Sequence, residues 1–164
     1  MSKRVNIYDL AVGGEGVGRL DDGRVVFVAG AAVNDDLLVE VTEEKSRYAR
    51  GTILEVVSAG EGRIKPACRH VARGCGGCDW QHLSEEAQIE GKLLLVEDAL
   101  VKLGSIVSPD VGYVAGPESV RYRTTVRVGV ENGRAAYRRS RSPELVPVDD
   151  CLIAHPLIDE ILSE

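Results

Sequence analysis

The feature that most constrains this chain is its set of four cysteines, which joins two distant parts of the sequence. Three of them lie close together, spaced C-x6-C-x2-C at Cys68, Cys75 and Cys78, and the fourth, Cys151, lies far downstream. The close trio belongs to a glycine-rich loop, CRHVARGCGGC, and glycines let a backbone wrap tightly around a small centre. A fold that brings the four thiols together must therefore pack the last part of the chain against this loop.

Composition places the chain among globular proteins of the cytoplasm. Its 164 residues are 44% apolar, which is typical of a chain that can bury a core. No apolar run reaches the roughly eighteen residues that span a bilayer. The first residues, MSKRVNIYDL, lack the apolar stretch of a signal peptide. We therefore expect a cytoplasmic location and no membrane partner, and in that reducing compartment close cysteines indicate metal binding rather than disulfides.

Thiolates are soft, charged ligands that suit both iron–sulfur clusters and zinc. The spacing favours an iron–sulfur cluster, because structural zinc usually uses two C-x2-C knuckles, or one knuckle and a pair of histidines. Zinc stays an alternative, and a histidine would then replace a cysteine. The candidate histidines are His70, His82 and His155. A thioredoxin-like role for CGGC is disfavoured, since no βαβ pattern surrounds it.

The charge of the chain is strongly patterned. Its formal net charge is -6, yet residues 120–143 hold seven arginines against one acidic residue, Glu131. A polyanion senses local charge within a Debye length of about 8–10 Å rather than the overall sum. The segment is therefore either a site for RNA phosphates or a solvated arginine-rich hairpin. The candidate contacts in it are Arg121, Arg123, Arg127, Arg138, Arg139 and Arg141.

Residues 1–58 predict an all-β domain. Short β-branched runs such as RVVFVAG and RGTILEVV alternate with Gly and Asp clusters, a pattern typical of a small closed barrel. A helix is predicted over residues 84–104, with Ser84 as its N-cap and Gly104 as its end. Its apolar stripe is predicted to be core. The stripe consists of Ile89, Leu93, Val96, Leu100 and Leu103.

The rest of the chain predicts a return to strands. We expect an antiparallel sheet over residues 111–148, with a hairpin that turns at Asn132-Gly133. Strand alternation in YRTTVRVGV would place Arg121, Arg123 and Arg127 on one face. PLIDEILSE predicts a helix that begins near Pro156. The fold class is mainly β with one long helix: an oligonucleotide-binding-like barrel over 1–58, then a cysteine-bearing α+β subdomain over 59–164.

These residues resemble a known family. The stretch CGGCDWQHLS, followed by EAQIEGK and VEDALVKLG, resembles the iron–sulfur region of the RNA (uracil-5-)-methyltransferases. The motifs GGEGVGR, VVFVAGAAVNDDLLVEV and YARGTILEVV resemble the TRAM domain, a small RNA-binding barrel that precedes it in many members. YRTTVRVGV and AAYRRSRSPELVPVDDC resemble the central β-subdomain. The resemblance runs nearly from end to end.

The resemblance implies a [4Fe–4S] cluster with Cys68, Cys75, Cys78 and Cys151 as ligands, and a structural role for it. It also implies RNA as partner, ribosomal RNA before transfer RNA, bound by the arginines above. Family members methylate carbon 5 of uridine with S-adenosylmethionine. Further candidates for RNA contact are Arg19 in the barrel and the tyrosines Tyr48, Tyr122 and Tyr137.

The family's catalytic domain, which binds S-adenosylmethionine and carries the cysteine nucleophile, has no counterpart here. Only thirteen residues follow Cys151, and such a domain needs well over 100 residues. We therefore expect no methyl transfer from this chain alone, and interpret it as part of a longer enzyme or as a separate RNA-binding protein. Two alternatives from other classes are a small electron-transfer iron–sulfur protein and a zinc-stapled adaptor.

Overall fold

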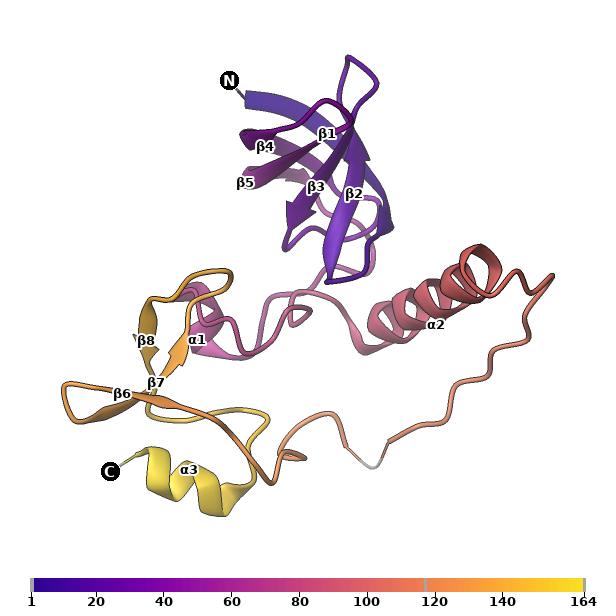
Figure 1. Cartoon of the computed structure of the whole chain (residues 1–164). Helices are drawn as coiled ribbons and strands as arrows, with labels where there is room; N and C mark the ends of the chain where they lie inside the picture. Colours follow the sequence, from indigo (N-terminus) through magenta and orange to yellow (C-terminus); the bar gives the residue numbers. More distant parts are fainter. Residues whose placement is uncertain (1, 117, 164) are drawn as a thin grey trace. The chain divides into compact units, whose positions relative to one another are not determined.

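The computed structural model describes residues 2–116 and 118–163 and divides the chain into two compact units (Figure 1). The first unit comprises the chain up to Lys65 together with His82–Tyr113. The second comprises Pro66–Gln81 and the chain from Val114 onward. The predicted boundary after residue 58 thus differs from this division, in which the long helix clusters with the barrel and the cysteine loop with the last part of the chain.

A closed five-stranded barrel forms most of the first unit (Figure 1), as predicted for residues 1–58. The strands follow the order β1-β2-β3-β5-β4, and β4 pairs back with β1. All neighbours are antiparallel except β3 and β5. Closure leaves no sheet edge open to another chain. The bounds are β1 Ser2–Leu10, β2 Glu15–Arg19, β3 Val25–Ala29, β4 Asp36–Glu44 and β5 Tyr48–Ser58.

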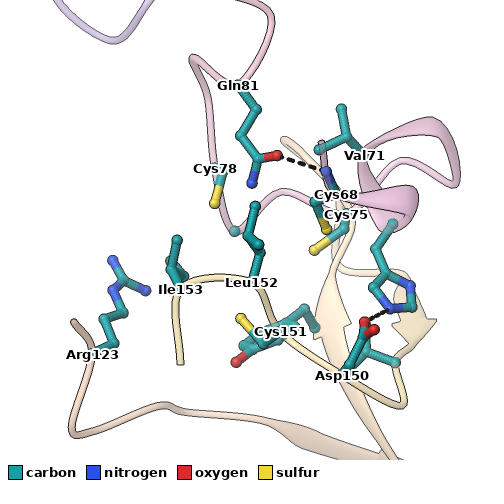
Figure 2. Close-up of a pocket in the computed structure, with 14 residues that line it drawn as sticks. Cys68, Val71, Cys75, Cys78, Gln81, Arg123, Asp150, Cys151, Leu152 and Ile153 are labelled. Carbon is teal, nitrogen blue, oxygen red and sulfur yellow. Dashed lines mark hydrogen bonds and ion pairs between the residues drawn. The ribbon is translucent and has the colours of Figure 1, made fainter. Parts of the chain in front are cut away.

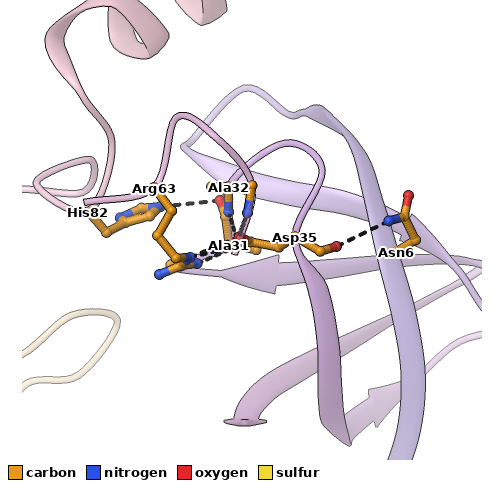
Figure 3. A network of polar contacts seen from close by, with 8 residues as sticks. Asn6, Ala31, Ala32, Asp35, Arg63 and His82 are labelled. Atoms are coloured by element: carbon orange, nitrogen blue, oxygen red, sulfur yellow. Dashed lines mark hydrogen bonds and ion pairs between the residues drawn. The ribbon is translucent and has the colours of Figure 1, made fainter. Parts of the chain in front are cut away.

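Alternating residues of these strands point inward and make one apolar core. The buried members of the core are Val5, Ile7, Leu20, Val26, Val28, Ala31, Leu37, Val39 and Ala49. A buried ion pair ties the chain after the barrel to this core (Figure 3). The fully buried Asp35 carboxylate accepts from the Arg63 Nε at 2.9 Å and from the N–H of Ala32 at 2.6 Å. Next to it, His82 Nε2 lies 3.2 Å from the Ala31 carbonyl oxygen.

Helix α2 spans Glu85–Lys102 and begins as predicted, since the Ser84 hydroxyl accepts a hydrogen bond from the N–H of Ala87. The prediction that its apolar stripe forms core is wrong, because Ile89, Leu93 and Leu100 are only half-buried and the other two members are exposed. Val96 is 47% exposed and Leu103 is 86% exposed. Residues in the range 87–94 of the helix contribute to a pocket that Tyr8 and Leu10 of β1 also line. No helix in the described ranges is long and apolar enough to cross a membrane.

A three-stranded antiparallel sheet, β6-β7-β8, organises the second unit. Its strands are β6 Gly129–Glu131, β7 Arg134–Arg138 and β8 Leu145–Pro147. The hairpin turn falls at Asn132 and Gly133 as predicted, and both residues have positive φ (51° and 77°), as a type I′ turn requires. Two short helices complete the unit: α1 Arg69–Ala72, and α3 Pro156–Leu162, which begins at the predicted proline.

The predicted sheet over residues 111–148 is too long, because residues 111–128 form no strand in the part of the chain that the structure describes. The N–H groups of Arg121 and Arg123 instead donate to the carbonyl oxygens of Leu152 (3.1 Å) and Ile153 (2.8 Å). Arg121 also has a φ of 56°, which breaks strand alternation. The prediction that alternation places Arg121, Arg123 and Arg127 on one strand face is therefore wrong.

Candidate metal centre

The cysteine loop folds around a single helical turn. Cys68 occupies the N-cap position of α1 with extended backbone. The His70 carbonyl oxygen accepts hydrogen bonds from the N–H groups of Arg73 at 3.1 Å and Cys75 at 3.0 Å. The chain therefore reverses directly after the turn, and Cys75 returns toward Cys68.

The C-x2-C knuckle, Cys75–Cys78, is fastened to the sheet. Its first residue forms an isolated antiparallel bridge with Arg139, next to the end of β7, and the Gly76 N–H donates to the Arg138 carbonyl oxygen at 2.9 Å. A Cβ atom at Gly76 would lie 2.7 Å from backbone atoms of Ser140. Only glycine allows this close approach of two backbones. The knuckle and β7 are therefore one continuous hydrogen-bonded structure.

The fourth cysteine is held by the segment that leads into α3. The Cys151 N–H donates to the Asp159 carboxylate at 2.7 Å, and its carbonyl oxygen accepts from the N–H of Ala154 at 3.0 Å. His155 caps the helix, because its Nδ1 accepts from the N–H of Leu157 at 3.3 Å. The ring of His155 thus serves the helix end.

All four cysteines line one pocket of the second unit (Figure 2). Cys68 and Cys75 enter it from the loop, Cys78 from the other end of the knuckle, and Cys151 from the opposite wall. Apolar side chains make up much of the remaining lining. They include Val71, Val148, Leu152 and Ile153. The structure thus brings together the four residues that the sequence singled out as metal ligands.

Two of the cysteines do not favour the free thiolate form. Burial raises the pKa of the Cys75 and Cys78 thiols, and the neighbouring thiols of Cys68 and Cys151 raise it further. Both effects penalise negative charge. A positively charged centre would reverse this balance at Cys75 and Cys78, since metals deprotonate coordinating thiols.

Gln81 connects two of the cysteines and was missed by the sequence analysis. Its Oε1 accepts a hydrogen bond from the Cys68 N–H at 3.1 Å (Figure 2). Its side chain also hydrogen-bonds to the Cys78 thiol and thereby lowers the pKa of that group against the effect of burial. The one available signal was an amide three residues after Cys78. One side chain thus holds the backbone of Cys68 and the thiol of Cys78.

A polar clamp, defined as Arg69 and His70 with Asp149 and Asp150, joins the two cysteine-bearing segments. His70 is 1% exposed, and its Nε2 lies 2.7 Å from the Asp150 carboxylate. The Arg69 guanidinium lies 2.7 Å from the Asp149 carboxylate. The basic pair directly follows Cys68 and the acidic pair directly precedes Cys151. Sequence distance concealed this clamp, which fixes the first and last cysteines relative to each other.

Two buried polar side chains of the pocket lie beside the cysteines. His70 Nδ1 has no hydrogen-bond partner among the residues described. Burial, together with a hydrogen bond to Cys151, raises the pKa of Tyr137, which keeps its hydroxyl a proton donor. The Tyr137 hydroxyl is therefore placed to donate to the sulfur of Cys151.

One further group of potential metal ligands lies close together in the described part of the chain. The ligand atoms of His70, Asp149 and Asp150 lie within 4.8 Å of one another. These three residues belong to the polar clamp, where the His70 ring pairs with the two carboxylates.

The candidate RNA contacts are distributed over both units. In the barrel, Arg19 is exposed and its Nη1 donates to the Gly23 carbonyl oxygen at 2.7 Å. Tyr48 is half-buried, and its ring packs edge-on against Phe27 with centroids 5.9 Å apart. Tyr48 is therefore in part ordinary sheet packing.

In the second unit, the structure brings Arg127 and Arg138 together along one groove beside the β6–β7 hairpin. Arg139 instead pairs with Glu144 at 2.9 Å, and Arg141 lies in the connection between β7 and β8. Tyr122 is 51% exposed. The predicted arginine patch is thus divided, and only two of its members share a groove.

Known proteins match both the barrel and nearly the whole length of the chain. Residues 2–54 match the family model of the TRAM domain, so the barrel is a TRAM domain. An RNA methyltransferase of Caldanaerobacter subterraneus is 38% identical over 97% of this chain. The 23S rRNA (uracil(1939)-C(5))-methyltransferase of Halomonas elongata is 36% identical over 95% of it. The chain is thus similar along nearly its whole length to RNA methyltransferases.

The chain spans about a third of the curated relatives that it matches, namely 36% and 33% of the two proteins above. A solved structure, the tRNA (uracil-54, C5)-methyltransferase of Pyrococcus abyssi with S-adenosyl-L-homocysteine, matches 97% of this chain and 34% of its own. The TM-score is 0.65 and the identity 22%, so this likeness concerns the fold.

Proposed function

We propose that this chain is the RNA-binding and iron–sulfur portion of an S-adenosylmethionine-dependent RNA (uracil-5-)-methyltransferase. The observation that carries the proposal is the pocket in which Cys68, Cys75, Cys78 and Cys151 converge, in a chain whose barrel is a TRAM domain. The pocket supports metal binding and the barrel supports RNA binding. The relatives support the reaction class.

In this proposal the four cysteines hold a [4Fe–4S] cluster, which would act as a structural staple. The presence of a single C-x2-C knuckle, together with a remote fourth cysteine in the same pocket, supports a cluster over zinc. Other residues of the chain position the cysteines. Gln81 orients Cys68 and Cys78, and the polar clamp holds the segments of Cys68 and Cys151 together. We assign the site a structural role, which is to hold the cysteine-bearing segments together, and not a role in electron transfer.

RNA is the partner we propose, with ribosomal RNA preferred over transfer RNA. Two of the relatives that align over most of the chain are named as 23S rRNA methyltransferases. The tRNA methyltransferase of Pyrococcus abyssi is only 22% identical. Arginine suits phosphate contacts because its planar guanidinium binds two oxygens at once. We assign the methyl-transfer chemistry to the part of each relative that does not align with this chain.

Salt-dependent RNA binding tests this proposal. The chain should bind a single-stranded RNA, with an affinity that falls steeply as salt rises, because phosphate contacts release counterions. Replacing Arg138 and Arg139 together by alanine should weaken binding and flatten the salt dependence. An unchanged slope would remove both arginines from the interface, and a wild-type chain without RNA affinity would contradict the proposal.

A further inference from the structure

A groove on the second unit lies back to back with the cysteine pocket. It runs beside the β6–β7 hairpin, and Arg127, Arg138 and the glycines Gly76 and Gly77 contribute to its walls. Apolar residues form much of the remaining lining, namely Val128, Val130, Ala136, Pro143 and Leu145. The groove thus combines cationic groups with an apolar surface, which suits a single-stranded polyanion whose bases and sugars also need contact.

The two arginines of the groove differ from other arginines of the unit. Arg139 is paired with Glu144 and Arg69 with Asp149. Arg127 and Arg138 are exposed and have no ion-pair partner in the part of the chain that the structure describes. Their charge is therefore available to a ligand, and no acidic side chain lines the groove to oppose an anion.

The groove and the cysteine pocket share a wall. Gly77 and Tyr137 line both of them. Tyr137 lies in β7, and its hydroxyl is next to Cys151 on the pocket side. The knuckle, residues 75–78, is also hydrogen-bonded to the Arg138 backbone through Gly76. The same few residues therefore position two thiols on one side and the groove on the other.

We propose that this groove binds single-stranded RNA and that RNA affinity is coupled to metal occupancy of the cysteine pocket through the knuckle and Tyr137. The proposal rests on the proposed function and adds the surface and the coupling. An occupied pocket fixes the knuckle, and a fixed knuckle fixes the groove wall. Because coupling between two binding sites is reciprocal, bound RNA must stabilise the occupied pocket by the same factor.

The groove is tested with single substitutions that remove equal charge. Arg127→Ala and Arg138→Ala should each weaken binding of a fluorescein-labelled, unstructured RNA about fivefold to tenfold, as expected for the loss of one charged contact. Arg134→Ala, in the same hairpin but outside the groove lining, should change affinity less than about twofold at physiological salt. Equal effects of the three substitutions would overturn the groove as the binding surface.

The coupling is tested on the wild-type chain purified without oxygen. Iron loss to a chelator, followed by visible absorbance, should be several-fold slower with saturating RNA than without it. The chelated chain should bind the RNA correspondingly more weakly, with circular dichroism as the check that the barrel remains folded. Iron loss that is indifferent to RNA would overturn the coupling while leaving the groove intact. A metal-loaded chain that binds no RNA would instead contradict the proposed function itself.

Discussion

The two units of this molecule reach an ordered structure by different means. The barrel buries nine apolar residues in one core and closes its own edges. The second unit has three strands of three to five residues, and its buried apolar side chains are few. Short sheets with small cores usually need a metal or a disulfide. The comparison teaches that the barrel depends on packing, whereas the second unit depends on its cysteine pocket and on polar contacts around it.

The largest expected effect is the unfolding of the second unit alone. Removal of the metal by a chelator, or Cys151→Ser, should abolish amide exchange protection in residues 66–81 and 145–163, because metal binding supplies folding free energy where the core is small. Strands β1, β3 and β5 should keep their protection. Hydrogen–deuterium exchange with mass spectrometry reads both units in one experiment. Full protection of the cysteine loop in the metal-free chain would show that the pocket is not the source of its order.

The next largest effect is a loss of stability of the barrel. Asp35→Ala leaves the half-buried Arg63 guanidinium without its carboxylate partner. Loss of one member of a buried ion pair costs about 3–5 kcal/mol of unfolding free energy. Urea unfolding of the barrel should detect this loss, with iron content unchanged. Asp22→Ala, which removes an exposed partner of Arg24, is the matched control and should leave the midpoint in place.

The same ion pair predicts the pH dependence of the barrel. Burial raises the pKa of Asp35, but hydrogen bonds from Arg63, Gly60 and Ala32 outweigh it and hold the pKa below its usual value. The carboxylate therefore contributes stability above its unfolded pKa of about 3.9, and this contribution is lost as pH falls through the lower folded value. Unfolding free energies measured from about pH 6 to pH 3 should decline in the wild type. The decline should be shallower in Asp35→Ala.

A smaller effect is expected on metal affinity when Gln81 is replaced. Gln81→Leu removes the amide that serves both Cys68 and Cys78 while keeping its approximate volume. Groups that orient metal ligands typically contribute about 10-fold to 100-fold in metal affinity. Competition with a chelator measures this directly. Asp79→Ala, at an exposed position of the same loop, is the control, and an equal loss in both variants would contradict the role of Gln81.

The smallest effect concerns helix α2. Leu103 belongs to the stripe that the sequence predicts as core, yet it is 86% exposed. Leu103→Gln should therefore change the unfolding free energy by less than about 0.5 kcal/mol, against the 2 kcal/mol or more expected when a core leucine is lost. Thermal unfolding of the two proteins decides between these values.

Local signals carried most of the fold prediction. Asn132-Gly133 specified the hairpin turn, Ser84 the start of α2, and Pro156 the start of α3, because each acts through its own backbone neighbours. The predicted start of the sheet at residue 111 was wrong, since β-propensity needs a partner strand and none forms there in the part of the chain described.

Prediction of the site followed the same rule. The cysteine spacing pointed to the residues that converge, but the surrounding support did not follow from sequence. His70 and Asp150 are eighty residues apart, and only the fold brings their side chains within 2.7 Å. The sequence also did not predict that the arginines would have different partners. Arg138 and Arg139 are adjacent in sequence, yet one lines the groove and the other pairs with Glu144.

The central claim is that the four cysteines hold an iron–sulfur cluster, and metal analysis of the chain purified without oxygen tests it most directly. We predict a brown protein with about four irons and about four sulfides per chain, and an iron content that falls to near zero in Cys151→Ser. One zinc per chain without sulfide would contradict the claim, and would identify the pocket as a zinc site on an RNA-binding barrel.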